Sequence, residues 1–216
     1  MYFKSCALLA SSTLMVLLTV SPVSATSSAS AVWRATSDGC DLGGGGADIH
    51  AVTAAHNLLA TLADDHEAQG YCRNLLDHGT TDPELLSAAT LAVAASGTDT
   101  DFDRFVEGFR NAATPQDMLR CLYALAEFPE QRHVERAVEF AFSGEVKTQN
   151  APFLIHRCIA NRAHGNVAWQ MLRRRWTEAN DRFPSNTIVR MIDPVKLLNT
   201  DNVSADVQAF FSEHPI

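Results

Sequence analysis

The sequence predicts an all-α protein in which stacked antiparallel helix pairs form a HEAT-like curved solenoid. Apolar residues recur at helical spacing: the stretches 102–109 and 134–141 each place apolar side chains at i, i+3, i+4 and i+7. Pro83, Pro115 and Pro152 begin alternate predicted helices, as in helix-pair repeats. No stretch alternates like a half-buried strand. Because one helix pair cannot bury its own apolar face, neighbouring pairs stack; a compact irregular bundle is the alternative, since the pairs share no visible sequence pattern.

Capping residues and prolines mark where the individual helices begin. Thr81-Asp82 and Thr114 precede Pro83 and Pro115, so a capping side chain comes directly before a proline at the first helical position. Most of the predicted helices are similar in length and are joined by short turns, which indicates that neighbouring helices run antiparallel. The breaks predict helices at 47–63, 66–78, 83–96, 100–112, 115–127, 130–142, 151–163, 166–183, 193–199 and 204–213.

The predicted helix 166–183 carries the strongest core signal. Trp169, Leu172 and Trp176 fall at i, i+3 and i+7, so both indoles are expected to face the core. The charge run Arg173–Arg175 in the same helix is expected to be solvated.

The N-terminal region differs from the rest of the chain. Residues 1–25 combine a positive charge at Lys4, an apolar run and small residues before Ala25, which is the pattern of a secretory signal peptide. A short anchor helix or a misplaced start codon are the alternatives. Residues 26–46 are rich in Ser, Ala and Gly and are expected to form a flexible linker to a helical domain at 47–216. The protein is therefore expected to be secreted or extracytoplasmic, without a stable membrane span after cleavage, and cytoplasmic if this segment is no signal.

Composition narrows the class of partner. The 216 residues, 46% of them hydrophobic, suffice for one domain with a real core, or at most for two small ones. A formal net charge of -8 argues against nucleic acid, because phosphate binding needs a basic face. Cys40, Cys72, Cys121 and Cys158 lie too far apart for a zinc ribbon, and whether they form disulfides or remain buried thiols stays open.

Candidate chemistry in the sequence is sparse. His66-Glu67 begins like the zinc-peptidase motif HExxH, but Gly70 stands where the second histidine would be. The glycines at 43–46 lack the Gly-Lys-Ser of a phosphate loop, and the eight histidines are never paired at metal spacing and are expected at the surface. The sequence therefore predicts no catalytic, cofactor-binding or metal-ligating residue.

Several motifs in the second half carry a resemblance to a known family. They read ALAEFP at 124–129, SGEVKTQNAP at 143–152, GNVAWQML at 165–172 and AFFSEHP at 209–215. Together they resemble the C-terminal helical domain of zinc aminopeptidases, the family of aminopeptidase N and the endoplasmic-reticulum aminopeptidases. The resemblance is dense from about residue 119 to 215 and looser back to about residue 47.

The resemblance implies a non-catalytic domain that accommodates peptide and closes over a catalytic domain. The HExxH and GxMEN motifs of that catalytic domain are absent from this sequence, so the chain is not expected to be active alone. Lys147 and Gln149 are the candidate peptide-binding residues; Thr148, Gln149 or Asn150 is expected to cap the following helix. Asn150 replaces the Asp common in the family. The expected partners are peptide or a separate catalytic domain. The alternatives are a secreted stand-alone helical-repeat binding module and an inactive truncated gene product.

Overall fold

The computed structural model describes residues 61, 65–80, 82–198 and 203–214, and within these ranges every regular element is helical. The all-α prediction is confirmed. In chain order the elements are α3 (His66–His78), α4 (Pro83–Ala95), α5 (Asp99–Arg110), α6 (Pro115–Ala124), the 3₁₀ helix η1 (Leu125–Glu127), α7 (Gln131–Phe142), α8 (Ala151–Ala160), α9 (Gly165–Arg174), α10 (Trp176–Arg182), α11 (Ser185–Ile192), η2 (Asp193–Leu197) and α12 (Val203–Glu213).

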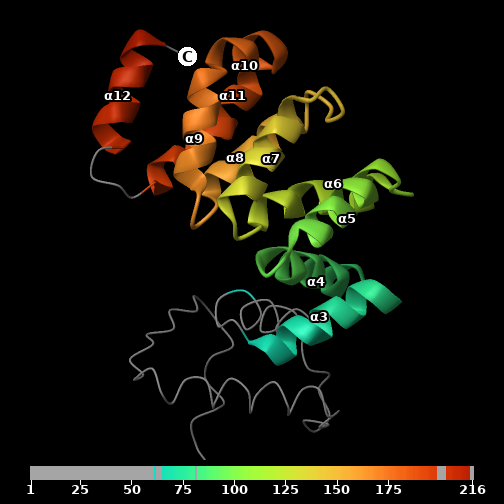
Figure 1. The fold of residues 1–216 in the computed structure, drawn as a ribbon. Coiled ribbons are helices and arrows are strands. Elements are labelled where there is room, and N and C mark those ends of the chain that lie inside the picture. Colours follow the sequence, from blue (N-terminus) through green and yellow to red (C-terminus); the bar gives the residue numbers. More distant parts are fainter. Residues whose placement is uncertain (1–60, 62–64, 81, 199–202, 215–216) are drawn as a thin grey trace, which may run out of the picture. The chain divides into compact units, whose positions relative to one another are not determined.

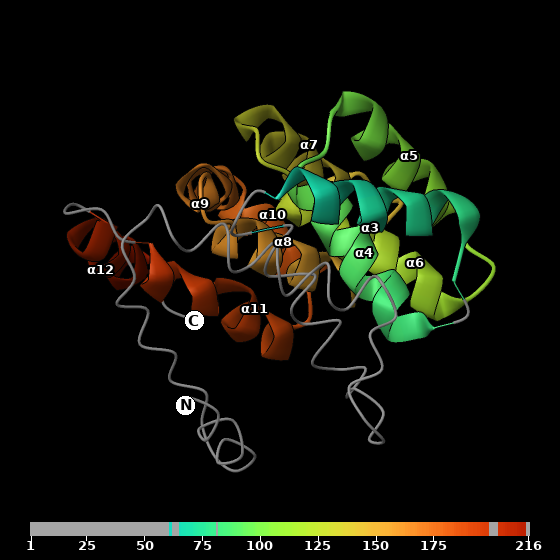
Figure 2. The same ribbon diagram turned by 90° about the horizontal axis from the view of Figure 1, so that it is seen from below.

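The described helices stack as successive antiparallel pairs (Figure 1). Helix α3 packs on α4, α5 on α6, and α7 on α8. Helices α4, α6, α8 and α11 also contact one another in that order, which makes them one layer, whereas α7 and α9 belong to the other. In Figure 2, α5, α7 and α9 lie along the upper side, α11 lies along the lower side, and α8 runs between them. The second helices of consecutive pairs therefore share one face of the stack.

Side-chain caps fix the helix starts as the sequence indicates. Asp65 and Asp82 each accept hydrogen bonds from two backbone N–H groups in the first turn of α3 and α4. Thr114 caps α6 by accepting from the backbone N–H of Asp117 at 3.1 Å. These bonds satisfy N–H groups that have no partner inside the helix.

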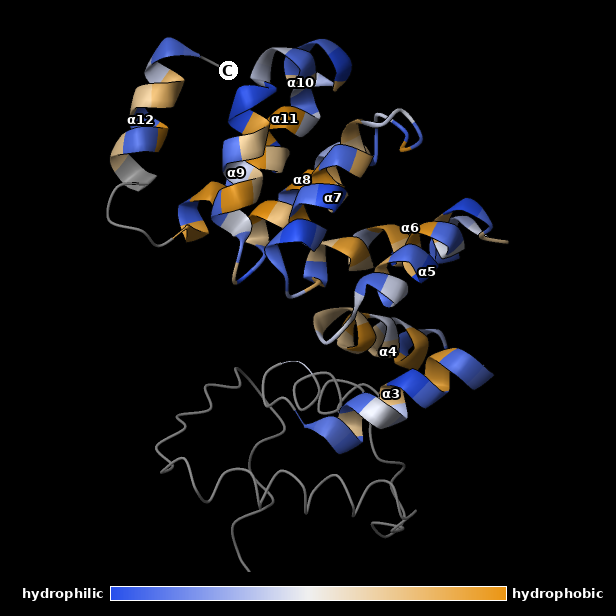
Figure 3. Cartoon of the chain, in the orientation of Figure 1, coloured by the Kyte–Doolittle hydropathy of each residue, from blue (hydrophilic) through white to orange (hydrophobic). Residues whose placement is uncertain are grey.

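The core follows the predicted apolar stripes. Phe102, Phe105 and Phe109 are buried, and the four apolar positions of the stretch 134–141 are fully buried. Figure 3 shows α4 coloured mainly as hydrophobic, whereas α3 and α5 mix hydrophilic and hydrophobic residues. A helix that is apolar on most sides has to be covered on most sides. Helix α4 meets this condition because α3, α5, α6 and η1 all pack against it.

Helix α12 packs against an aromatic cluster on α9 and α10. The Phe210 ring lies edge-on to Trp169 and Trp176, at 5.4 and 5.3 Å between centroids, and Phe211 contacts both indoles as well. Such edge-to-face pairs add to the stability gained from burial alone. The prediction that both tryptophans face the core is confirmed.

Four details of the helices differ from the sequence-based predictions. The predicted helix 166–183 breaks at Arg175 into α9 and α10, and the predicted helix 193–199 is the short 3₁₀ turn η2. Helix α11, which lies between them, was not predicted; its Ile188 and Met191 are buried against α8 and the other helices of the stack. The run Arg173–Arg175 is only partly solvated.

Arg173 and Arg175 are partly buried because their guanidinium groups contact aromatic rings and pair with carboxylates. The guanidinium of Arg173 lies over Phe210 at 5.0 Å and pairs with Asp206. Arg175 lies over Phe142 at 4.0 Å and bonds Glu139 and Glu178. Charged side chains of this length bury their apolar stems while the head group stays paired.

The predicted signal peptide 1–25, the linker 26–46, Cys40 and nearly all of the predicted helix 47–63 lie outside the described residues. Cys72, Cys121 and Cys158 are free cysteines. Burial raises the pKa of Cys72 to about 11, which makes it an inert buried thiol at neutral pH. No helix within the described ranges is long and apolar enough to span a bilayer.

Candidate functional site

The segment Leu125–Pro129 at the end of α6 is held rigidly by side chains of the next helix pair. Helix α6 tightens into the 3₁₀ turn η1, and Pro129 follows two residues after its end. The Asn161 amide donates to the carbonyls of Ala126 at 2.8 Å and Phe128 at 3.2 Å. Hydrogen bonds from a side chain to otherwise unpaired carbonyls fix the path of a chain that has left the helix.

Phe128 anchors the same segment from the other side. Its side chain is fully buried, and its ring lies edge-on to Phe102, Phe105 and His133 at 5.1, 5.8 and 5.1 Å between centroids. Gly97 makes room for it, because a Cβ at that position would stand 2.4 Å from the Phe128 ring. The residue before Phe128, Glu127, is therefore presented from a fixed backbone.

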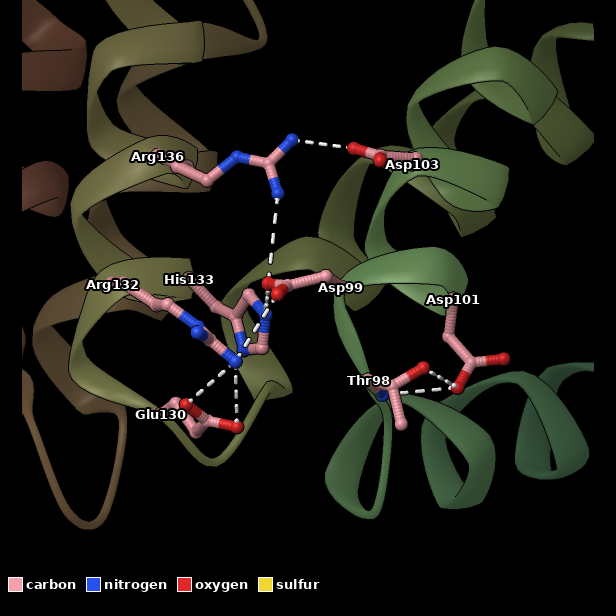
Figure 4. A network of polar contacts seen from close by, with 8 residues as sticks. All are labelled: Thr98, Asp99, Asp101, Asp103, Glu130, Arg132, His133 and Arg136. Atoms are coloured by element: carbon pink, nitrogen blue, oxygen red, sulfur yellow. Dashed lines mark hydrogen bonds and ion pairs between the residues drawn. The ribbon is translucent and has the colours of Figure 1, made fainter.

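An ionic network links α5 to α7 (Figure 4), and its His133 ring packs on Phe128. His133 is fully buried, against the prediction of surface histidines, and its Nε2–H donates to the Asp99 carboxylate at 2.7 Å. Arg132 and Arg136 also approach Asp99, and Arg136 pairs with Asp103 at 2.5 Å. Because its carboxylates and guanidiniums are already paired with one another, this network serves the packing of α5 on α7.

Unlike the paired charges of this network, Glu127 lines a cavity of about 420 Å³ between α6 and α8. The charged group that faces its carboxylate is the Arg157 guanidinium, whose Nη1 lies 3.7 Å from Oε1, beyond hydrogen-bonding distance. The other lining residues are Tyr123, Phe153, His156 and Ala160. The cavity thus combines two aromatic rings with one carboxylate and one guanidinium.

The other side chains of the cavity are fixed by their own contacts. The Arg157 guanidinium lies over the Tyr123 ring at 5.0 Å, a cation–π contact. The Nδ1–H of His156 donates to the Arg190 carbonyl at 2.7 Å and so ties α8 to α11. The cavity is therefore built by two helices of the same layer and braced by a third.

Burial shapes the electrostatics of this cavity. Desolvation raises the pKa of the Glu127 carboxyl, and the charge of Arg157 only partly opposes that shift. Desolvation also raises the pKa of the Tyr123 hydroxyl, again with Arg157 acting in the opposite direction. Glu127 is thus a partly buried carboxylate whose acceptor positions are available to a ligand.

A second cavity lies on the other side of Glu127. It has a volume of about 550 Å³, and Leu91, Phe128, Pro129 and Arg162 are among the residues that line it together with Glu127. Glu127 lines both cavities. The two cavities therefore adjoin at this residue, the first between α6 and α8 and the second toward α4 and the turn that follows α8.

The predicted peptide-binding residues Lys147 and Gln149 lie elsewhere, in the turn between α7 and α8. Both are exposed, and neither lines one of the cavities described above. The turn is not capped by a side chain as predicted: Asn150 makes no side-chain cap bond, and the Lys147 carbonyl instead accepts from the backbone N–H groups of Asn150 and Ala151 at 2.8 and 3.0 Å. The peptide-binding role of Lys147 and Gln149 stays a prediction.

The residues present do not fit a zinc site in the part of the chain that the structure describes. His66 and Glu67 are exposed in the first turn of α3, and Gly70 supplies no ligand at the next turn. No group of three or more His, Cys, Asp and Glu side chains is placed to hold a metal there.

Sequence reasoning missed Tyr123, Glu127, Phe153 and Arg157. Glu127 stood inside the motif ALAEFP, which was used only as a mark of resemblance. The spacing of Tyr123 and Glu127, and of Phe153 and Arg157, is four residues on adjacent helices, so each pair shares one helix face. That repeated aromatic-then-charged spacing was the available signal.

Comparison with known proteins places this fold in a family. The chain is 26% identical over 133 residues to aminopeptidase M1-A of Oryza sativa subsp. japonica, an alignment that covers 60% of this chain and 15% of the rice protein. It is 25% identical over 118 residues to probable aminopeptidase 2 of Sulfurisphaera tokodaii, which covers 54% of this chain and 15% of that protein. The model of the ERAP1-like C-terminal domain matches residues 46–216. The chain belongs to the ERAP1-like C-terminal domain family, which confirms the resemblance to the C-terminal domain of aminopeptidase N relatives.

Proposed function

We propose that this helical domain accommodates peptide and works with a zinc aminopeptidase catalytic domain, whether that domain lies on a longer form of this polypeptide or on another one. Family membership and the names of the relatives support the association with aminopeptidases. The alignments span about 15% of those relatives, so their whole-protein activity is not transferred to this chain.

The observation that carries the proposal is the cavity between α6 and α8. A peptide offers apolar side chains, N–H donors and C=O acceptors, and the cavity offers aromatic walls, an acceptor at Glu127 and a donor at Arg157. The cavity lies on the face formed by the second helices of consecutive pairs. Stacked helix pairs use extended faces of this kind to bind elongated ligands.

The domain's role is to hold the distal part of a peptide while another domain performs the chemistry. Closure of a helical domain over a reaction site excludes water and retains the substrate. Lys147 and Gln149, exposed in the α7–α8 turn, remain proposed additional peptide contacts.

Peptide binding and activity of the purified chain test this function together. We expect the chain to bind peptides in a fluorescence-anisotropy titration, to contain no stoichiometric zinc and to release no amino acid from an aminopeptidase substrate on its own. Addition of a candidate catalytic domain should then give a complex whose turnover of long peptides exceeds that of the catalytic domain alone.

The alternatives predict different results. A secreted stand-alone binding module would bind ligand without forming that complex or changing its turnover. Chelator-sensitive turnover by this chain alone would instead establish an active peptidase and contradict the proposal. Double replacement of Lys147 and Gln149 by Ala should weaken peptide affinity if these residues contribute, with the exposed Val189→Ala as the matched control.

A further inference from the structure

Glu127 and Arg157 form an opposite-charge pair that leaves its hydrogen-bonding capacity unused. The two groups approach to 3.7 Å without a hydrogen bond, and no other hydrogen bond to either side chain is present within the described part of the chain. Elsewhere on the same fold, Arg–carboxylate pairs close to hydrogen-bonding distance: Arg73 on Asp101 at 2.6 Å and Arg110 on Glu145 at 2.8 Å. Arg136 and Asp99 also stay 4.0 Å apart, but each of them has another hydrogen-bonded partner, whereas Glu127 and Arg157, the open pair, have none within the described part of the chain.

The open pair presents one acceptor and one donor to the same cavity. A purely anionic ligand group would be repelled by the Glu127 carboxylate, and a purely cationic group would be repelled by the Arg157 guanidinium. A ligand that carries both a donor and an acceptor, without net charge, satisfies both side chains. In an extended polypeptide, one residue points its own N–H and C=O to the same side and exchanges both hydrogen bonds with the opposite residue of an antiparallel neighbour.

We propose that Glu127 and Arg157 together take the place of such a neighbour and bind the main chain of an interior, extended peptide segment. The N–H of one peptide residue donates to the Glu127 carboxylate, and the C=O of the same residue accepts from the Arg157 guanidinium. This inference rests on the proposed function and names its substrate class, a peptide recognised through its backbone.

The walls of the cavity define the side chain that accompanies this residue. Tyr123 and Phe153 are both partly exposed and line the cavity next to the charged pair. They favour an apolar side chain, whereas a charged one would lose hydration without gaining a partner. Neighbouring residues of the peptide reach the second cavity, beyond Glu127.

The test uses the full chain and a fluorescein-labelled peptide of about ten residues, acetylated and amidated so that neither terminus is charged, long enough to cross both cavities as an extended strand. A set of analogues carries one N-methyl group at each backbone amide in turn. We expect one position at which N-methylation weakens binding about tenfold, since it removes a hydrogen bond to a charged acceptor. Anisotropy titration measures each dissociation constant.

A double-mutant cycle assigns that loss to Glu127. In Glu127→Ala the unmodified peptide should bind about tenfold more weakly, and N-methylation at the sensitive position should cost nothing further. Glu130→Ala, an exposed acidic residue that pairs with Arg132, is the matched control and should leave the N-methyl effect intact. The melting temperature of each variant is measured alongside, so a binding loss is read only from folded protein.

The outcomes separate this inference from the proposed function. If the capped peptide binds but no N-methyl effect is coupled to Glu127, main-chain recognition is overturned while peptide accommodation stands. If binding requires a free terminal carboxylate, the site recognises the C-terminus of a peptide, and the inference is likewise overturned. If no peptide binds at all, with free or capped ends, the proposed function itself fails.

Discussion

Asp101 and Glu127 are two carboxylates beside arginines in the same helical stack, and their surroundings have opposite effects. Asp101 accepts hydrogen bonds from Arg73 at 2.6 Å and from both the backbone N–H and the hydroxyl of Thr98. Burial opposes its ionisation, yet these bonds outweigh it and lower the pKa of Asp101. At Glu127 burial dominates, because Arg157 stays at 3.7 Å, and the pKa is raised.

The difference separates a structural ion pair from a candidate binding group. Asp101 and Arg73 join α3 to α5, and each satisfies the other, so nothing remains for a ligand. Glu127 and Arg157 are brought to one cavity without satisfying each other. A partly buried charge without a hydrogen-bond partner in the protein costs stability, and proteins keep such costs where a function depends on them.

Phe128→Ala should give the largest effect, because this ring connects the two regions. Phe102, next to Asp101, and Phe128, next to Glu127, pack ring to ring at 5.1 Å. Loss of a fully buried phenylalanine costs about 3–5 kcal/mol of unfolding free energy. Urea denaturation measures it, and Val189→Ala, whose side chain is 55% exposed, should change stability by less than about 0.5 kcal/mol. Equal effects of the two substitutions would show that Phe128 is no anchor.

Asp101→Asn should destabilise the protein by about 1.5–3 kcal/mol at neutral pH, the value of a hydrogen bond to a charged group. Because the pKa of Asp101 is lower in the folded than in the unfolded protein, its stabilising effect is complete above the unfolded pKa. It is lost as the pH falls through the folded pKa. Urea unfolding at a series of pH values should therefore show the wild-type protein and the variant converging in acid; a constant gap would contradict the assignment.

The fold was predictable because its signals are local. Capping residues such as Asp82 and Thr114 act on the first turn that follows them, and apolar stripes such as 134–141 depend only on helical spacing. The misses have tertiary causes. Helix α11 is only eight residues long and is stabilised by the packing of Ile188 and Met191 in the stack, and the break at Arg175 allows that side chain to reach Glu139 on α7.

The site was less predictable because it depends on which residues meet. His133 reads as one more polar residue on α7, and only its placement between Phe102 and Phe128 buries it. Glu127 and Arg157 are far apart in the sequence and become neighbours only when α6 packs beside α8. Sequence motifs identified the family largely through core residues such as Trp169, and the motif ALAEFP gave no sign that Glu127 lines a cavity. The groups that are open to a ligand lie outside that core.

Glu127→Gln should give the smallest effect on stability and one of opposite sign. The neutral amide removes a desolvated charge, so the variant should be more stable than the wild-type protein at neutral pH, by less than about 1 kcal/mol because the side chain is 40% exposed and partly screened. The folded pKa of Glu127 is raised, so the wild-type protein recovers stability as acidification protonates this carboxyl. The difference in unfolding free energy between the variant and the wild-type protein should therefore shrink as the pH falls from above the folded pKa of Glu127 to below its unfolded pKa. The same urea series measures it. Asp101→Asn and Glu127→Gln thus approach the wild-type curve from opposite sides. A Glu127→Gln variant that is less stable than the wild-type protein at neutral pH would mean that Arg157 satisfies the carboxylate after all, and the contrast between the two carboxylates would disappear.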